Sequence, residues 1–215
     1  MPSSFVDAEI ASQPSTWRLA ADLAPDAATA LPRPGERVAV VGCGTSWFIA
    51  MSYAVLRENA GHGVTDAFAG SEFPLGRRYD RVVALTRSGT TTEILQLLDA
   101  TDLPTLAIVG DDSQPASALA DASIALPFAD EQSVVQTRFA TSTLALLRAS
   151  LGEDLSHAID DARAAVEFDV SRWVPSEQIT FLGRGWTVGL AQEAALKTRE
   201  AAQFWSEAYP AMDYR

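Results

Sequence analysis

Between residues 37 and 126, short apolar runs alternate with stretches of helical periodicity. Runs of this kind, rich in β-branched residues and bounded by glycine or polar residues, are typical of parallel strands covered on both faces. The alternation predicts an α/β fold with a doubly wound, five-stranded parallel sheet. We expect strands at residues 37–42, 64–68, 81–86, 105–109 and 123–126, with helices at 47–59, 91–99 and 116–120.

The segments on either side of the sheet are predicted to be mainly helical. Residues 5–23 have helical apolar spacing, which Pro14 should break into two short helices. Further helices are expected at 132–150 and 155–168, with a break at Gly152.

A second α/β unit is expected to begin near the C-terminal end of the sequence, with a strand at 179–182 and a helix at 188–205. One strand and one helix are too little to fold alone. These patterns predict an N-terminal helical segment at 1–34, a first domain at 35–170 and an incomplete second unit at 177–215.

Composition and charge narrow the functional classes. A net charge of −12 disfavours a nucleic-acid partner, because such binding needs clustered Lys and Arg. No apolar run is long enough to span a membrane and the N-terminus has no signal-peptide pattern, so we expect a cytoplasmic protein without a membrane partner. One cysteine, Cys43, and two histidines give no disulfide and no Cys/His metal framework, and we expect neither a metal nor a cofactor.

The first strand runs into a turn that combines glycines with hydroxyl side chains. Gly42 and Gly44 allow close approach of a ligand to the backbone, and Thr45 and Ser46 add donors at a helix start. An ordinary strand-to-helix turn with a capping threonine is the alternative interpretation.

A second loop, residues 86–92, follows the third predicted strand and opens a helix. It holds five hydroxyl side chains, one glycine and Arg87, whereas a helix cap needs only one hydroxyl. A phosphate here would meet backbone N–H groups, hydroxyls and the positive end of the helix. The alternative is a threonine-rich turn in a sequence that favours strands.

The motifs at residues 42–46, 70–73, 88–91 and 193–200, in this order, resemble the SIS (sugar isomerase) family. The likeness is greatest to the isomerase half of glucosamine-6-phosphate synthase and to bacterial amino-sugar-phosphate isomerases and deaminases. It implies a flavodoxin-like sheet and a small-molecule sugar phosphate as ligand.

The resemblance also implies which residues bind the ligand. Thr86, Arg87, Ser88 and Thr91 would hold the phosphate, and Thr45 and Ser46 the sugar or phosphate end. Gln136, in a loop that resembles the family's loop before the closing helix, would contact the substrate; its neighbour Arg138 is either a second contact or a solvated side chain. Two residues depart from the family pattern, Arg87 in place of Gln and Thr90 in place of Glu, so the sugar specificity stays open.

The candidate catalytic groups lie on the last predicted helix. Glu193, Lys197 and Glu200 are spaced to share one helical face, which by spacing alone indicates a solvated Glu–Lys pair. The resemblance instead implies that Glu200 is the base that moves a proton between adjacent sugar carbons, with Lys197 stabilising the enolate. Glu207 is expected near the end of the same helix.

Three functions stay open at this stage: a sugar-phosphate isomerase or deaminase, a non-catalytic sugar-phosphate sensor, and a plain structural subunit. The family's ring-opening histidine is not found after residues 207–209, so we expect binding of a sugar 6-phosphate with poor turnover. We also expect a homo-oligomer, most simply a dimer, because the second unit leaves apolar residues short of partners, namely Leu182, Leu190, Phe204 and Trp205.

Overall fold

The computed structural model describes residues 4–214, and a parallel sheet lies at its centre. The sheet has five strands in the order β2-β1-β3-β4-β5, which is the order of a flavodoxin-like doubly wound fold. The predicted α/β class and the five strands are therefore confirmed. The strands are β1 (Val38–Gly42), β2 (Thr65–Ala69), β3 (Arg81–Thr86), β4 (Thr105–Val109) and β5 (Ala122–Ala125).

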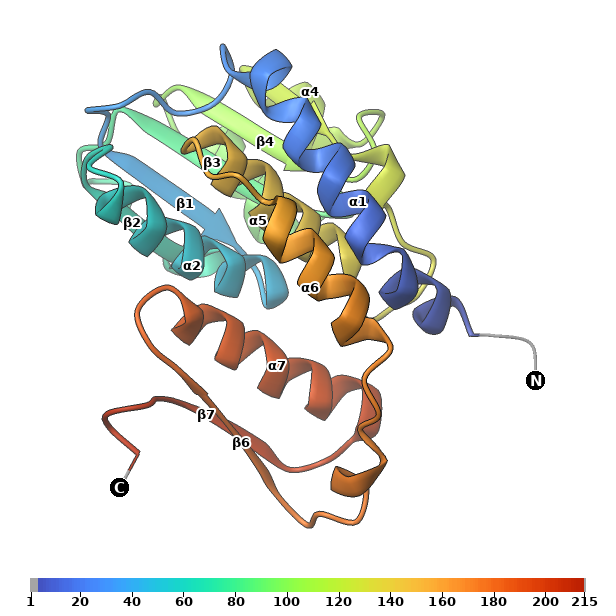
Figure 1. Cartoon of the computed structure of the whole chain (residues 1–215). Coiled ribbons are helices and arrows are strands. Elements are labelled where there is room, and N and C mark those ends of the chain that lie inside the picture. The colour runs from blue at the N-terminus through green and yellow to red at the C-terminus, as the bar shows by residue number, and fades with distance from the viewer. Residues whose placement is uncertain (1–3, 215) are drawn as a thin grey trace.

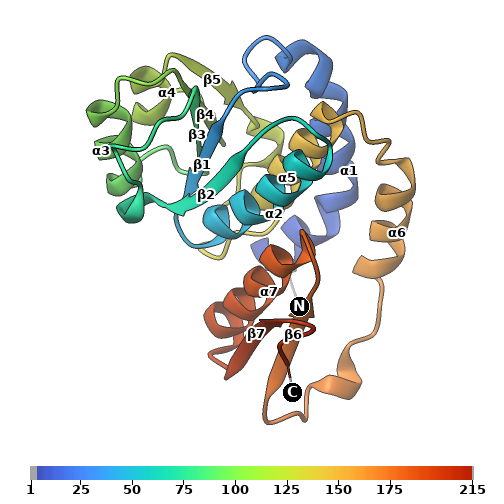
Figure 2. The ribbon, with the colours of Figure 1, turned by 90° about the vertical axis from the view of Figure 1, so that its left-hand side faces the viewer.

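Helices cover both faces of this sheet, as Figures 1 and 2 show. On one face lie α1 (Phe5–Ala27), α2 (Thr45–Asn59) and α5 (Arg138–Ser150), and on the other lie α3 (Thr92–Ala100) and α4 (Pro115–Leu119). Val38 and Val40 of β1 pack on the first group of helices, whereas Ala39 and Val41 pack on the second. Burial on both faces explains why the strands are continuous apolar runs.

The N-terminal helix is one element, so the predicted break at Pro14 is wrong. Pro14 is buried within α1, and the helix packs along α5. Trp17 Nε1 donates to Thr141 Oγ1 at 2.8 Å, and Ser142 Oγ lies 2.9 Å from Thr16 Oγ1. This packing outweighs the one backbone hydrogen bond that a proline removes.

The helix expected from residue 132 begins only at Arg138. Residues before it form a loop because buried carboxylates take up their backbone N–H groups: Gln132 N donates to Glu9 Oε1 at 2.6 Å and Thr137 N to Glu131 Oε1 at 2.6 Å. After Gly152 the chain continues in α6 (Ser156–Val166), as predicted. Short 3-10 helices lie at Gly70–Glu72, Pro127–Ala129 and Ser171–Trp173.

The C-terminal part forms a small second unit that is larger than expected. It contains β6 (Ile179–Gly183), α7 (Thr187–Ala202) and a second strand, β7 (Ser206–Pro210), which pairs with β6 in parallel. Helix α7 ends three residues before the predicted boundary, because Gln203 adopts a left-handed conformation with φ of 51°. Trp205 therefore lies outside the helix and Glu207 lies on β7, which corrects their predicted placement.

The second unit packs on the first through α7 and α2 (Figure 2). At their crossing, a Cβ on Gly189 would lie 2.4 Å from both the Phe48 carbonyl oxygen and Ser52 Oγ. Only glycine permits this approach, so Gly189 fixes α7 beside the start of α2. Leu190 joins the core of the first unit, against the prediction that it lacks partners, whereas Leu182 and Trp205 are exposed. None of the helices in residues 4–214 is long and apolar enough to cross a membrane.

Candidate functional site

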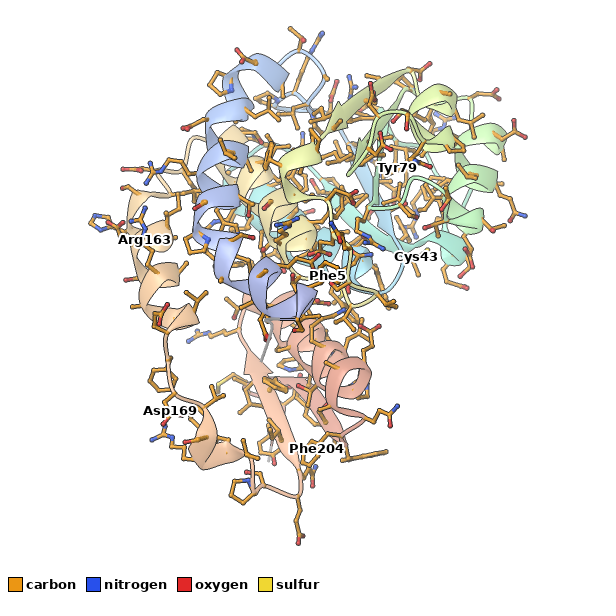
Figure 3. The ribbon with its side chains drawn as sticks, turned by 90° about the vertical axis from the view of Figure 1, so that its right-hand side faces the viewer. Phe5, Cys43, Tyr79, Arg163, Asp169 and Phe204 are labelled. Carbon is orange, nitrogen blue, oxygen red and sulfur yellow. The ribbon has the colours of Figure 1, made fainter. Side chains whose placement is uncertain are left out.

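The two predicted loops meet at the carboxyl edge of the sheet. β1 and β3 are neighbouring parallel strands, and Gly42 at the end of β1 is paired with Leu85 near the end of β3. Ligands of open α/β sheets bind at this edge, next to the point where the strand order reverses. Figure 3 shows Cys43, in the first loop, at the end of the sheet that faces the second unit.

Two backbone carbonyl groups of the β3–α3 loop, residues 86–91, accept hydrogen bonds from the segment after β4. Gly110 N donates to the Arg87 carbonyl at 2.9 Å and Ala116 N to the Gly89 carbonyl at 3.0 Å. Gly89 has a φ of 62°, and a Cβ there would lie 2.4 Å from the Gln114 Cβ. A larger residue at position 89 would therefore collide with Gln114, which follows β4, and would displace the loop.

The same loop contains backbone donors that are not used in hydrogen bonds. In the described part of the chain, the backbone N–H groups of Ser88, Gly89 and Thr91 donate to no other group. They lie directly before α3, where the helix dipole adds positive potential. Three free backbone donors at the start of a helix can bind an anion.

The hydroxyls of the loop are not consumed by capping. Thr91 is the N-cap of α3, but its side chain makes no cap hydrogen bond and lies 3.2 Å from Thr86 Oγ1. Ser88 is exposed and its Oγ accepts from Thr90 N at 3.3 Å. The Thr86 and Thr91 hydroxyls are thus neighbours, and Ser88 lies in the same loop.

Arg87 points to a neighbouring loop. Its Nη1 donates to the carbonyl oxygens of Glu131 and Ser133, at 2.8 and 3.4 Å. Gln136 belongs to the same neighbouring loop, and its buried Oε1 has no hydrogen-bond partner among residues 4–214. Arg138 donates to the Asp130 carbonyl and to Ser12 Oγ, so its side chain links α5 to α1.

The first loop places two buried hydroxyls at the start of α2. Thr45 and Ser46 are each 4% exposed, and Gly44 before them has a φ of 53°. A Cβ on Gly42 would lie 2.5 Å from the backbone of Ser46, so glycine is required where the strand meets the helix.

A carboxylate from the second unit faces this loop. Glu193 of α7 is 9% exposed, its Oε1 lies 3.7 Å from Lys197 Nζ, and its Oε2 has no partner within the described residues. Burial raises the pKa of Glu193 from its ordinary value of 4.5 to about 7, although the Lys197 charge and the Thr45 side chain lower it. A carboxyl group with this pKa changes its charge near neutral pH, and it lies beside Thr45.

Lys197 bridges two carboxylates on α7. Its Nζ lies 2.5 Å from Glu200 Oε2 and 3.7 Å from Glu193 Oε1. The Glu200 side chain is 41% exposed, in contrast to the buried Glu193. The sequence placed these three residues on one face but did not show which carboxylate is buried. Gly189, four residues before Glu193, is the sequence feature that could have indicated the burial of Glu193, because its lack of a side chain lets that face of the helix approach α2.

Comparison with known proteins gives relatives over most of the chain. The glutamine–fructose-6-phosphate aminotransferase (isomerizing) of Sulfolobus acidocaldarius is 30% identical over 193 residues, which is 81% of this chain and 33% of the relative. The chain thus spans about a third of the length of the curated relatives it matches. No protein-family model matches the chain.

Solved structures share the fold at low identity. The C-terminal domain of glucosamine-fructose-6-phosphate aminotransferase from Francisella tularensis matches with a TM-score of 0.78 and 20% identity, over 98% of this chain and 71% of that one. Glucosamine-6-phosphate deaminase from Thermotoga maritima matches with a TM-score of 0.74 and 22% identity, over 99% and 72%. With the five-stranded sheet and the ordered motifs, these similarities bear out the resemblance to SIS domain proteins and show that the chain has their α/β fold.

Proposed function

We propose that this protein binds a sugar 6-phosphate with the phosphate on the β3–α3 loop. The observation that carries the proposal is the set of free N–H groups of Ser88, Gly89 and Thr91 at the start of α3. The Thr86, Ser88 and Thr91 hydroxyls supply further donors, so the phosphate would be held without a metal.

The sugar would extend from this loop toward the start of α2 and the face of α7. Glu193 lies beside Thr45 there, and its unpartnered Oε2 disfavours a second anion at Thr45 and Ser46. These two hydroxyls therefore suit sugar oxygens better than phosphate. The α7 face also carries Lys197 and Glu200, which are paired at 2.5 Å.

The reaction that this arrangement supports best is proton transfer between adjacent sugar carbons. Glu200 would abstract the proton and Lys197 would stabilise the enolate charge, as the family resemblance implies. Glu193, with a pKa of about 7, would exchange a proton with a sugar oxygen near neutral pH. We therefore propose an isomerase or deaminase acting on an amino- or keto-sugar 6-phosphate. Relatives named as an isomerizing aminotransferase and as a deaminase support this class.

A non-catalytic sugar-phosphate sensor is the second candidate. The exposure of Glu200 favours it, because a carboxylate open to water is a poor place for carbon-acid chemistry. For either function we propose a homodimer, which the exposed Leu182 and Trp205 of the second unit support. We also propose a cytoplasmic location, as expected from the sequence.

Calorimetric titration with glucosamine 6-phosphate and fructose 6-phosphate, combined with a turnover assay, tests the proposal. Wild type should bind in the micromolar to millimolar range, and Ser88→Ala with Thr91→Ala should weaken binding about 10-fold or more. Ser113→Ala, which removes an exposed hydroxyl bonded to Asp111, is the matched control and should bind like wild type. Equal binding by the double variant would refute the phosphate loop, and binding without turnover would favour the sensor.

A further inference from the structure

The loop at residues 130–137 forms a second wall beside the phosphate loop and is fixed by buried charges. Glu9 of α1, only 3% exposed, accepts from Gln132 N at 2.6 Å and from Ser133 N at 3.2 Å. Burial alone would raise the pKa of Glu9, but hydrogen bonds from Ser133 and Gln132 outweigh it and hold the pKa below its ordinary value. A carboxylate with this many donors is a firm anchor for the loop.

A second carboxylate anchors the other end of the same loop. Glu131 is 7% exposed, and its Oε1 accepts from Thr137 N, Thr137 Oγ1 and Phe139 N at 2.6, 2.9 and 3.1 Å. It thereby caps the start of α5 from a distance, in the place of a local N-cap side chain. The loop is thus tied to α1 by Glu9 and to α5 by Glu131.

Arg87 is the link from the phosphate loop to this anchored segment. Both hydrogens of its Nη1 are engaged, because the Glu131 and Ser133 carbonyl oxygens both accept from it. Its Nε is buried and has no partner in the described chain. Because Nε is buried, only Nη2 can reach a ligand, and a two-donor contact to phosphate through the Nε–Nη2 edge would require the side chain to move.

We infer that Arg87 is a positioning residue, which locks the 130–137 loop against the phosphate loop so that both walls of the site are set before ligand binds. The inference rests on the proposed phosphate site and changes the role of Arg87 from the direct contact that the sequence predicted. The phosphate itself would then be held by neutral N–H and hydroxyl donors.

The consequence concerns specificity. Neutral donors on a fixed loop would favour ligands whose phosphate group fits their geometry. The 130–137 loop, which carries Gln136, would limit which sugars can be attached to that phosphate. Loosening the loop should weaken binding of a sugar phosphate more than binding of inorganic phosphate, which touches only the first wall. A direct contact from Arg87 would weaken both ligands alike.

Hydrogen exchange and titration on Arg87→Gln and Arg87→Lys test this role. Arg163→Gln, which removes an exposed arginine paired with Asp160 on α6, is the matched control. Both Arg87 variants should lose exchange protection at Gln132 and Ser133 by about 10-fold or more without ligand, because the segment opens locally. Lysine should fail to restore protection, since it keeps the charge but lacks the fork that spans two carbonyls.

The titrations use inorganic phosphate and glucosamine 6-phosphate at two salt concentrations. We expect both variants to bind the sugar phosphate about 3- to 30-fold more weakly, the range for losing one or two hydrogen bonds, with an unchanged salt dependence. Unchanged exchange protection in both variants, or rescue of affinity by lysine together with a reduced salt dependence in Arg87→Gln, would overturn the inference. If wild type binds no sugar phosphate, the proposed function fails, while the exchange data still decide the role of Arg87.

Discussion

Replacing Glu193 with glutamine should change how stability depends on pH. The folded protein holds the Glu193 proton up to a pKa of about 7, whereas the unfolded chain releases it near 4.5. Between these values the folded state binds more protons, so the unfolding free energy of wild type falls as pH rises through this window. The difference between the folded and unfolded pKa values corresponds to a fall of about 3 kcal/mol in the unfolding free energy between pH 4.5 and pH 7.

Glutamine keeps the shape of the side chain but cannot ionise. The Glu193→Gln variant should therefore lack this slope. Near pH 4.5 its unfolding free energy matches that of wild type, and above pH 7 it is more stable by about 3 kcal/mol, a difference that already includes the attraction of the ionised carboxylate to Lys197. Denaturant unfolding of both proteins from pH 4.5 to 8 measures the difference, in which all other titrating groups cancel. Thr45→Val removes a side chain that lowers the Glu193 pKa and should move the slope to higher pH. Parallel pH profiles for wild type and Glu193→Gln would refute the assignment of a buried, proton-holding carboxylate.

Three further predictions follow from the packing. Gly189→Ala should cost about 1–3 kcal/mol and weaken sugar-phosphate binding, because its Cβ would collide with α2; Gly76→Ala, with open space around it, should leave denaturant midpoint and affinity unchanged. Arg57→Met should cost about 3 kcal/mol or more in the same unfolding assay, because the carbonyl oxygens of Arg33 and Glu36 lose a buried donor; a loss below about 0.5 kcal/mol would contradict this account. Light scattering at high micromolar concentration should show an assembly larger than one chain, since Leu182 and Trp205 are exposed; a uniform monomer would count against self-association.

The sheet and the hydroxyl-rich β3–α3 loop were predictable because the residues that define each of them lie close together in the sequence. Strands buried on both faces require continuous apolar runs, and those runs matched β1 to β5 to within a residue or two. The excess of hydroxyls around Ser88 marked a loop with more donors than a cap needs. In both cases the interactions that define the element lie within a few residues of it.

Several of the features that the sequence did not predict depend on contacts between distant segments. Pro14 stays in a continuous helix because α1 packs on α5. The segment before α5 leaves the helix in part because Glu9, more than 120 positions away, accepts from the N–H groups of Gln132 and Ser133. The burial of Glu193 likewise depends on the crossing of α7 over α2 at Gly189. A helical pattern shows which residues share a face, but the neighbour that the face meets is set by the tertiary fold.

The most direct test of the account is a residue-resolved titration of the backbone amides in the β3–α3 loop. Nuclear magnetic resonance of the ¹⁵N-labelled protein should show saturable shifts of the Ser88, Gly89 and Thr91 amide signals on addition of glucosamine 6-phosphate. Unphosphorylated glucosamine should leave these three signals in place, since the donors are matched to the phosphate. Saturable shifts that avoid this loop, or an equal response to both sugars, would contradict the central claim that the start of α3 is the phosphate site.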